Sequence, residues 1–187
     1  MIIDRKKEKI RNAITYFLNN TSASGKKKIY KLLFLFDFEH YKLTGRSVTG
    51  FDYFAWQMGP VPTALDTAID QQSEEITKDF DIEIQPTKFR HPTIYLHPKT
   101  DFEEKFFSEL ELDLLKGIAE RFGLSTGDEM VWFTHQEHYP WYRVYEVERR
   151  LKEKIPYSYA LEDLEATDKE RILNIEKERQ AFFETYQ

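Results

Sequence analysis

The chain has 187 residues, of which 41% are hydrophobic and 16% aromatic, so it is long enough for one domain with a substantial core. It contains no cysteine, which excludes disulfides, thiolate zinc sites and cysteine nucleophiles and suits a reducing cytoplasm. The net charge is −6, although residues 1–50 carry eleven basic and four acidic side chains. We interpret this basic part as the solvated faces of two helices, and the negative overall field makes nucleic acid an unexpected partner.

No apolar run approaches the roughly 20 residues that a membrane span needs, and the charged N-terminus lacks the apolar core of a signal peptide. We therefore expect a cytoplasmic protein that has no membrane partner. Apolar residues at helical spacing predict a first helix over residues 4–19, with Asp4 as its N-cap.

A second helix is predicted over residues 26–43, ending at Gly45. It is apolar around most of its circumference, so it should be the central core helix. Asp37 lies within it, and we expect this carboxylate to pair with a Lys or Arg inside the bundle.

The aromatic residues 51–58 predict a strand. Pro60 and Pro62 cannot continue that strand, so we expect residues 59–62 to form a rigid corner that leads into a helix ending near Gln72. On the first interpretation, these residues have a structural role only and connect the strand to the helix. The alternative is the rigid rim of a protein-binding surface that includes Trp56 and Met58, since large aromatic residues and Met are favoured interface anchors.

The rest of the chain is predicted to form a hairpin and then helices. The expected segments are a hairpin over 81–85 and 93–97; a helix over 102–122 that ends at Gly123; a helix from a capping box at Ser125 or Thr126 to about His135; a short segment from Pro140 to Lys152; and a last helix from Thr167 to about Tyr186. This order predicts a mainly α (α+β) fold, a helical bundle-like domain with a small antiparallel β-sheet or hairpin.

We expect one domain over residues 1–160 and a charged helical extension over residues 161–187. A thin apolar stripe in the extension is predicted to dock either on the body or on a partner. Its members are Ile172, Ile175, Phe182 and Phe183.

His135 and His138 form the segment nearest to a metal motif, because two His at i, i+3 can share a helix face. Pro140 should end the helix before such a site forms, so we expect capping and hydrogen bonding around a buried Trp141 and no bound metal. A metal-dependent hydrolase or nuclease that uses His135 and His138 stays an alternative.

Asp37, Glu39 and His40 lie within one helical turn, where a carboxylate and an imidazole could support acid–base chemistry. Asp37 and Glu39 are two residues apart and therefore point to different faces. Because no partner nucleophile stands out, we expect no catalytic residues and no cofactor.

Four lysines of the basic part could contact phosphates: Lys26, Lys27, Lys28 and Lys31. No helix-turn-helix or RNA-binding signature accompanies them. A DNA-binding regulator is kept as another alternative.

The run from Tyr30 to Leu65 resembles the Panacea domain, the SocA-like antitoxin family. The matching pieces are Lys31-Leu32-Leu33, Gly45-Arg46-Ser47-Val48-Thr49-Gly50, Ala55-Trp56 and Gly59-Pro60-Val61, followed by Thr134-His135 and Pro140-Trp141. The resemblance covers about residues 8–155.

The resemblance implies a phage-associated antitoxin of a toxin–antitoxin system, not an enzyme. Such a protein binds a cognate toxin, encoded beside it, and occludes or distorts it. An adaptor that presents the toxin to a protease is an alternative. The expected partner-binding residues are Trp56, Met58, Gly59, Pro60, His135 and Trp141. The oligomeric state stays unpredicted.

Overall fold

The computed structural model describes residues 5–87 and 91–185, apart from the side chains of residues 180 and 183. Its elements, in chain order, are α1 (Arg5–Asn20), α2 (Lys26–Thr44), β1 (Tyr53–Trp56), β2 (Gly59–Pro62), α3 (Thr63–Asp70), α4 (Glu74–Thr77), β3 (Phe80–Gln85), β4 (Thr93–Pro98), the 3-10 turn η1 (Glu104–Phe106), α5 (Glu109–Phe122), α6 (Gly127–Thr134), α7 (Pro140–Tyr142), the π-helical turn η2 (Arg143–Val147), the 3-10 turn η3 (Tyr157–Leu161) and α8 (Ala166–Thr185). Helices dominate, with two small antiparallel sheets in the described residues, so the predicted mainly α (α+β) class is confirmed.

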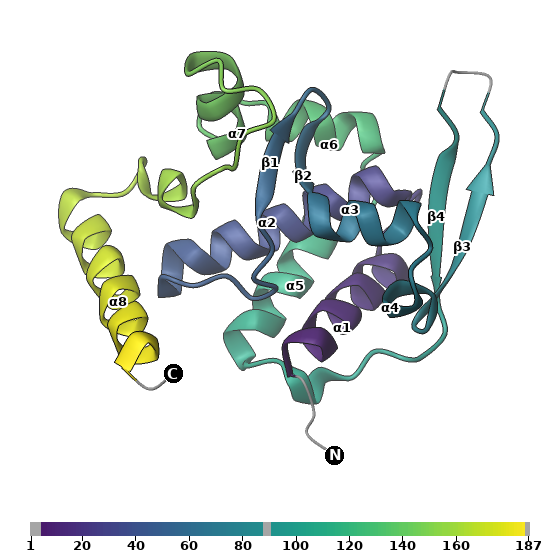
Figure 1. Ribbon diagram of the computed structural model, residues 1–187, viewed down its shortest axis with the longest axis horizontal. Coiled ribbons are helices and arrows are strands. Elements are labelled where there is room, and N and C mark those ends of the chain that lie inside the picture. Colours follow the sequence, from purple (N-terminus) through teal and green to yellow (C-terminus); the bar gives the residue numbers. More distant parts are fainter. Residues whose placement is uncertain (1–4, 88–90, 186–187) are drawn as a thin grey trace.

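Helix α2 is the centre of the fold (Figure 1), as its apolar circumference predicts. Helices α1, α5 and α6 and the β1–β2 hairpin pack around it. Its C-cap is Gly45 with φ +69°, whose N–H donates to the Tyr41 carbonyl. A left-handed residue at this position favours glycine, so the predicted end of the helix is confirmed. The predicted N-cap of α1, Asp4, lies outside the described residues.

Asp37 is held by hydrogen bonds from neutral groups, so its predicted pairing with a Lys or Arg is wrong. Its carboxylate accepts from the backbone N–H groups of Val48 and Thr49, at 2.8 Å each, and from the Tyr53 hydroxyl at 2.7 Å. The Thr49 hydroxyl donates as well. Burial raises the pKa of Asp37, and these donors oppose that rise. Asp37 therefore ties α2 to the turn that leads into β1.

Residues 59–62 form strand β2, so the predicted strand-to-helix corner is wrong. The strand pairs antiparallel with β1, with Pro60 opposite Ala55 and Pro62 opposite Tyr53. Ala55 and Tyr53 bond instead to residues 152–155 through their backbones. The two prolines therefore lie at positions where no N–H is needed toward β1, and a strand can contain both.

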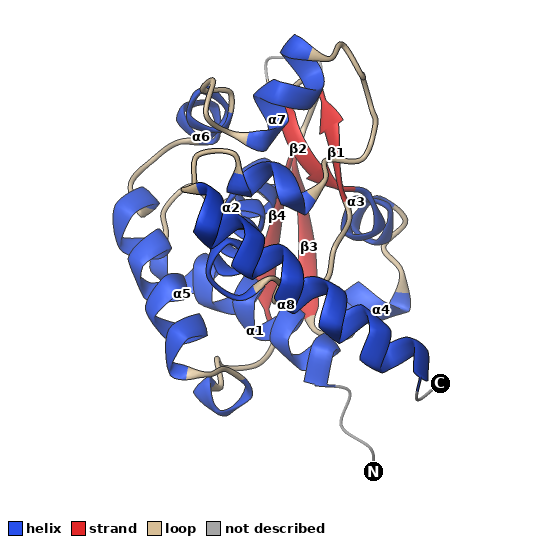
Figure 2. Ribbon diagram, turned by 90° about the vertical axis from the view of Figure 1, so that its left-hand side faces the viewer, coloured by secondary structure: helices blue, strands red, loops and turns tan. Residues whose placement is uncertain are grey.

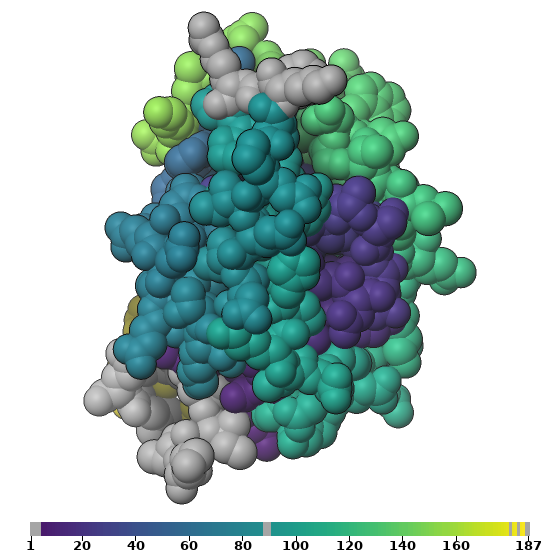
Figure 3. Space-filling model, turned by 90° about the vertical axis from the view of Figure 1, so that its right-hand side faces the viewer, coloured from purple at the N-terminus to yellow at the C-terminus, as the bar shows by residue number. Residues whose placement is uncertain are grey.

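The predicted β3–β4 hairpin is confirmed, with a register from Phe80 opposite Pro98 to Gln85 opposite Thr93. It covers one side of the molecule beside α1 and α2 (Figure 3). Part of its expected loop, residues 88–90, lies outside the described residues.

Helix α5 begins later than predicted, because Ser108 and Glu111 form a capping box at its start. Of the two capping boxes considered for α6, the structure has Thr126 with Glu129. Helix α5 ends at Phe122 with Gly123 as its C-cap residue, so the predicted end is confirmed, although Gly123 has a right-handed φ of −54°. An added Cβ at Gly123 would lie 2.8 Å from the Ala119 carbonyl oxygen, and close approach explains this glycine instead.

Helix α8 lies at the edge of the molecule, beside the C-terminal end of α2 (Figures 1 and 2). Ile172 is fully buried, and the Tyr41 hydroxyl donates to Glu176 at 2.7 Å. Ile175 and Phe182 are exposed, and the Phe183 side chain lies outside the described residues. The predicted stripe therefore docks on the body at Ile172. Among the described helices, none is long and apolar enough to cross a bilayer.

Candidate functional site

Residues from three distant segments meet beneath the tip of the β1–β2 hairpin. Lys31 of α2 is fully buried there, and its ammonium donates to the Pro60 carbonyl at 3.0 Å. Gly59 has φ +100°, and a Cβ at this position would lie 2.6 Å from Lys31 Cε. Glycine is therefore required at position 59 for two reasons: its backbone angle, and the close approach of the Lys31 side chain. Thr134 at the end of α6 borders the same position, since a Cβ added to Gly59 would lie 3.3 Å from Thr134 Oγ1.

Trp141 connects α7 to the β1–β2 hairpin. It is almost fully buried, and its indole N–H donates to the Trp56 carbonyl at 2.9 Å. The His135 ring stacks on it, with centroids 3.5 Å apart and planes at 6°. Tyr145 also stacks on Trp141, at 4.6 Å and 15°. Together these contacts fix the position of the hairpin tip relative to α6 and α7.

Burial weakens both bases of this site. Desolvation and the neighbouring charge of Lys27 lower the pKa of Lys31 to about 7, with Asp66 opposing. Desolvation and the charge of Lys31 lower the pKa of His135 to about 4, so this imidazole is neutral at pH 7. Among the described residues, the buried Nε2 of His135 has no hydrogen-bond partner. The site is thus a packed junction with two poorly solvated bases.

His135 and His138 do not share a helix face. Helix α6 ends at Thr134, His135 is its C-cap residue, and the exposed His138 ring lies 4.5 Å from that of Tyr139. Within residues 5–87 and 91–185, no three His, Cys, Asp or Glu residues are grouped so that they could hold a metal ion.

The six predicted partner-binding residues fall into two groups. Trp56 and Met58 are exposed, with 36% and 43% of their surface accessible. Gly59, Pro60 and Trp141 are buried, and His135 is partly exposed beside them. Trp56 and Met58 therefore lie on the molecular surface, and the buried residues support them from within the fold.

The four lysines considered as phosphate-binding candidates lie in different environments. Lys28 and Lys31 are buried, so these two lysines are not accessible for the phosphate contacts considered as an alternative. Lys26 is paired with Asp66 at 3.1 Å and with Asp70. Only Lys27 of the four lysines is exposed.

Asp37 and His40 have separate partners, because His40 Nδ1 donates to the Arg46 carbonyl at 2.8 Å. Asp37 instead accepts from residues 48, 49 and 53. The acid–base cluster considered from the sequence is therefore not assembled.

Sequence reasoning missed the partnership of Lys31 with Gly59. The available signal was a lysine inside an otherwise apolar helix face together with a glycine after an aromatic strand. Neither residue shows by itself that the two segments touch.

The protein is thus a mainly helical domain that carries a β1–β2 hairpin with an exposed tip. A family model for the SocA-like antitoxin Panacea domain matches residues 29–142. The match spans more than half of the chain, and the chain belongs to this family. Neither the comparison with curated proteins nor that with solved structures found a match.

The matched range includes Lys31, Gly59 and Thr134 together with the stacked pair His135 and Trp141, whereas Tyr145 lies beyond it. It ends at Tyr142, so η2, the segment after it and α8 lie beyond it. The resemblance identified from the sequence is confirmed over a narrower range than residues 8–155.

Proposed function

We propose that this protein is an antitoxin that neutralises a cognate toxin by direct binding at the tip of the β1–β2 hairpin. The observation that carries this proposal is membership of the SocA-like antitoxin family. The toxin is proposed to be encoded by the adjacent gene.

The surface chemistry supports binding at this place. Trp56 and Met58 are exposed at the tip, and large aromatic and Met side chains are frequent interface anchors. The tip is held by Trp141 and Lys31, so little conformational freedom is lost when a partner binds.

We further propose that the protein acts by binding and not by turnover. The polar groups that drew attention in the sequence serve internal contacts: Asp37 orders a turn, Lys31 holds the hairpin and His135 stacks on Trp141. The proposed mechanism needs no cofactor.

The test is co-expression of the adjacent gene with this chain from separate promoters. Wild type is expected to restore growth that the neighbouring product inhibits. Trp56→Ala with Met58→Glu is expected to abolish the rescue. Leu43→Glu, an equally exposed position on α2, is the control and should rescue like wild type. A harmless neighbour, or toxicity that wild type does not relieve, contradicts the proposal.

The same experiment separates occlusion from delivery to a protease. Rescue should persist in a host that lacks its ATP-dependent proteases if binding alone neutralises the toxin. Loss of rescue in that host favours the adaptor mechanism.

A further inference from the structure

A strained segment outside the family match borders the hairpin tip. We call residues Arg143–Lys154 the arm. It begins with the π-helical turn η2, and Arg149 and Lys152 have left-handed backbones, with φ +56° and +61°. Non-glycine residues avoid this region, and such conformations persist where the surrounding structure imposes them, often at functional sites.

The conformation at the end of the arm is held by strand-like backbone pairing with the outer edge of β1. The Lys152 N–H donates to the Ala55 carbonyl at 2.8 Å, and the Ala55 N–H donates to the Glu153 carbonyl at 2.9 Å. The Ile155 N–H continues the pattern by donating to the Tyr53 carbonyl at 2.8 Å. Backbone hydrogen bonds therefore join the end of the arm to the hairpin.

Glu148 organises the charged groups inside the arm. It accepts from Arg143 at 3.1 Å, from Arg150 at 3.2 Å and from the Tyr159 hydroxyl at 2.9 Å. These hydrogen bonds, that of Tyr159 first, lower the pKa of Glu148. The carboxylate therefore stays charged and keeps the arm in one shape.

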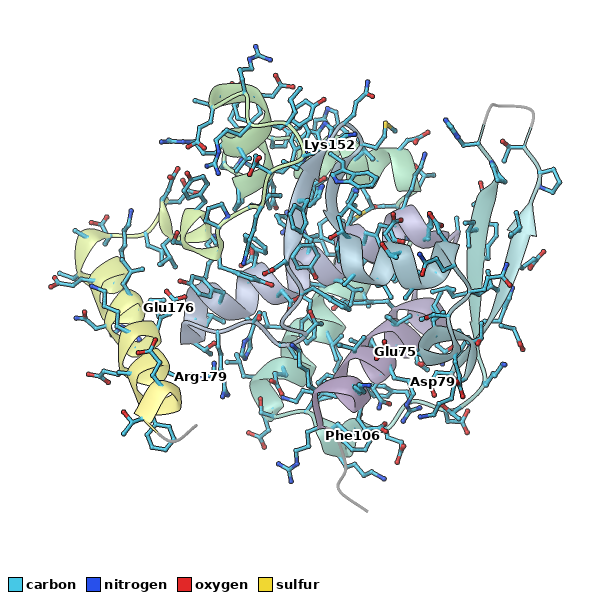
Figure 4. All side chains as sticks on the ribbon, viewed as in Figure 1. Glu75, Asp79, Phe106, Lys152, Glu176 and Arg179 are labelled. Atoms are coloured by element: carbon cyan, nitrogen blue, oxygen red, sulfur yellow. The ribbon has the colours of Figure 1, made fainter. Side chains whose placement is uncertain are left out.

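The arm presents apolar and basic side chains outward. Val147 and Leu151 are more than half exposed, although both are large and apolar. The Lys152 ammonium lies 5.9 Å from the centre of the Trp56 ring, at the top of the molecule in Figure 4. Among the described residues, Lys152 makes no ion pair. The arm and the hairpin tip thus form one continuous surface.

The charge of this surface differs from that of the chain. The arm carries five basic and three acidic residues, whereas the whole chain has a net charge of −6. Within the part of the chain that the structure describes, Arg149 forms an ion pair only with Glu146, at an exposed site where such pairs are weak and easily exchanged. An acidic partner is therefore attracted electrostatically to this surface, whereas the net negative charge of the rest of the chain would repel it.

We propose that the arm, together with Trp56, determines which toxin is bound, by receiving a toxin segment that carries acidic side chains beside an apolar anchor. This inference rests on the proposed function and adds the location and chemistry of specificity. A protein segment fits better than nucleic acid, because the arm's net positive charge is small and its apolar residues lie among the cations.

The experiment measures binding of the purified product of the adjacent gene by calorimetry. Val147→Asp with Leu151→Asp should weaken binding at least 100-fold, since the surface loses its apolar contacts and gains two negative charges. The control pair Leu43→Asp with Leu124→Asp adds the same charge at exposed positions elsewhere and should stay within threefold of wild type. All variants should melt within a few degrees of wild type.

A second variant isolates the charge. Arg149→Gly removes the cation and suits the left-handed backbone, so its melting temperature should equal or exceed that of wild type. Binding should weaken about tenfold at low salt, and the difference should shrink in high salt.

The outcomes separate the two proposals. If wild type binds and neutralises the toxin and both arm variants do so equally well, the arm does not determine specificity and only this inference fails. If wild type does not bind the toxin, the proposed function fails and takes the inference with it. Arm-dependent binding of a DNA or RNA oligonucleotide, without toxin binding, also overturns the inference.

Discussion

Helices α2 and α8 are both long and rich in charged residues, yet they have opposite roles in the fold. Helix α2 is buried along most of its length, and its polar residues Lys31, Asp37 and His40 each have an internal partner. Helix α8 packs at Ile172 and Glu176, and most of its described side chains are exposed. Charge on a helix therefore indicates solvent exposure in one case and internal scaffolding in the other. Substitutions on the two helices should differ accordingly.

The largest loss of stability is expected at Asp37. Asp37→Ala leaves four buried donors without an acceptor and should lower the free energy of unfolding by about 3–5 kcal/mol. Asp168→Ala on α8 removes an exposed carboxylate and should change it by less than about 0.5 kcal/mol. Urea denaturation measures both. Similar losses at the two positions would contradict the contrast.

The hairpin junction should be next in sensitivity. Gly59→Ala forces an L side chain into a φ of +100° and against Lys31, so we expect a loss of about 2–4 kcal/mol. Gly117→Ala is the control, since a Cβ there meets nothing within 4 Å in the middle of α5. That change should stabilise the protein by up to about 1 kcal/mol. Thermal and urea unfolding of the pair test the expectation.

Within α8, one position should matter more than its neighbours. Ile172→Ala removes fully buried methyl groups and should cost about 2–3 kcal/mol, whereas Ile175→Ala at the exposed face should cost under about 1 kcal/mol.

Truncation after Glu165 extends this test to the proposed division at residue 160. We expect a shortened chain that still unfolds cooperatively, at a lower melting temperature. Loss of the whole fold would mean that α8 belongs to the core as α2 does.

The smallest effect is a pH slope from Lys31. Its pKa falls from 10.5 to about 7 on folding, so the unfolded chain binds more protons between these values. Stability should therefore rise with pH from about 7.5 to 9.5, by at most about 1.4 kcal/mol per pH unit. Lys31→Met should flatten this slope, and Lys177→Met at an exposed position on α8 should leave it unchanged. Parallel slopes in wild type and Lys31→Met would show that the lysine does not titrate in this range.

Local patterns in the sequence predicted most of the elements. The spacing of apolar residues located α1 and α2, Gly45 marked the end of α2, and alternation located the β3–β4 hairpin. The motif pieces from Lys31 to Trp141 also identified the family. These signals work because helix and strand periods, caps and turns depend on residues a few positions apart.

The roles of the buried polar residues, and which candidate residues reach the surface, depend on tertiary packing. The two prolines predict a corner where the structure has strand β2, because a strand tolerates Pro60 and Pro62 only if their positions need no N–H toward β1, and that depends on tertiary pairing. Local patterns thus suffice to predict the helices, the β3–β4 hairpin and the family. Pairings such as Asp37 with Thr49, Lys31 with Pro60 and the arm with β1 join distant segments. They depend on how the chain packs in space, and a local pattern carries no record of that.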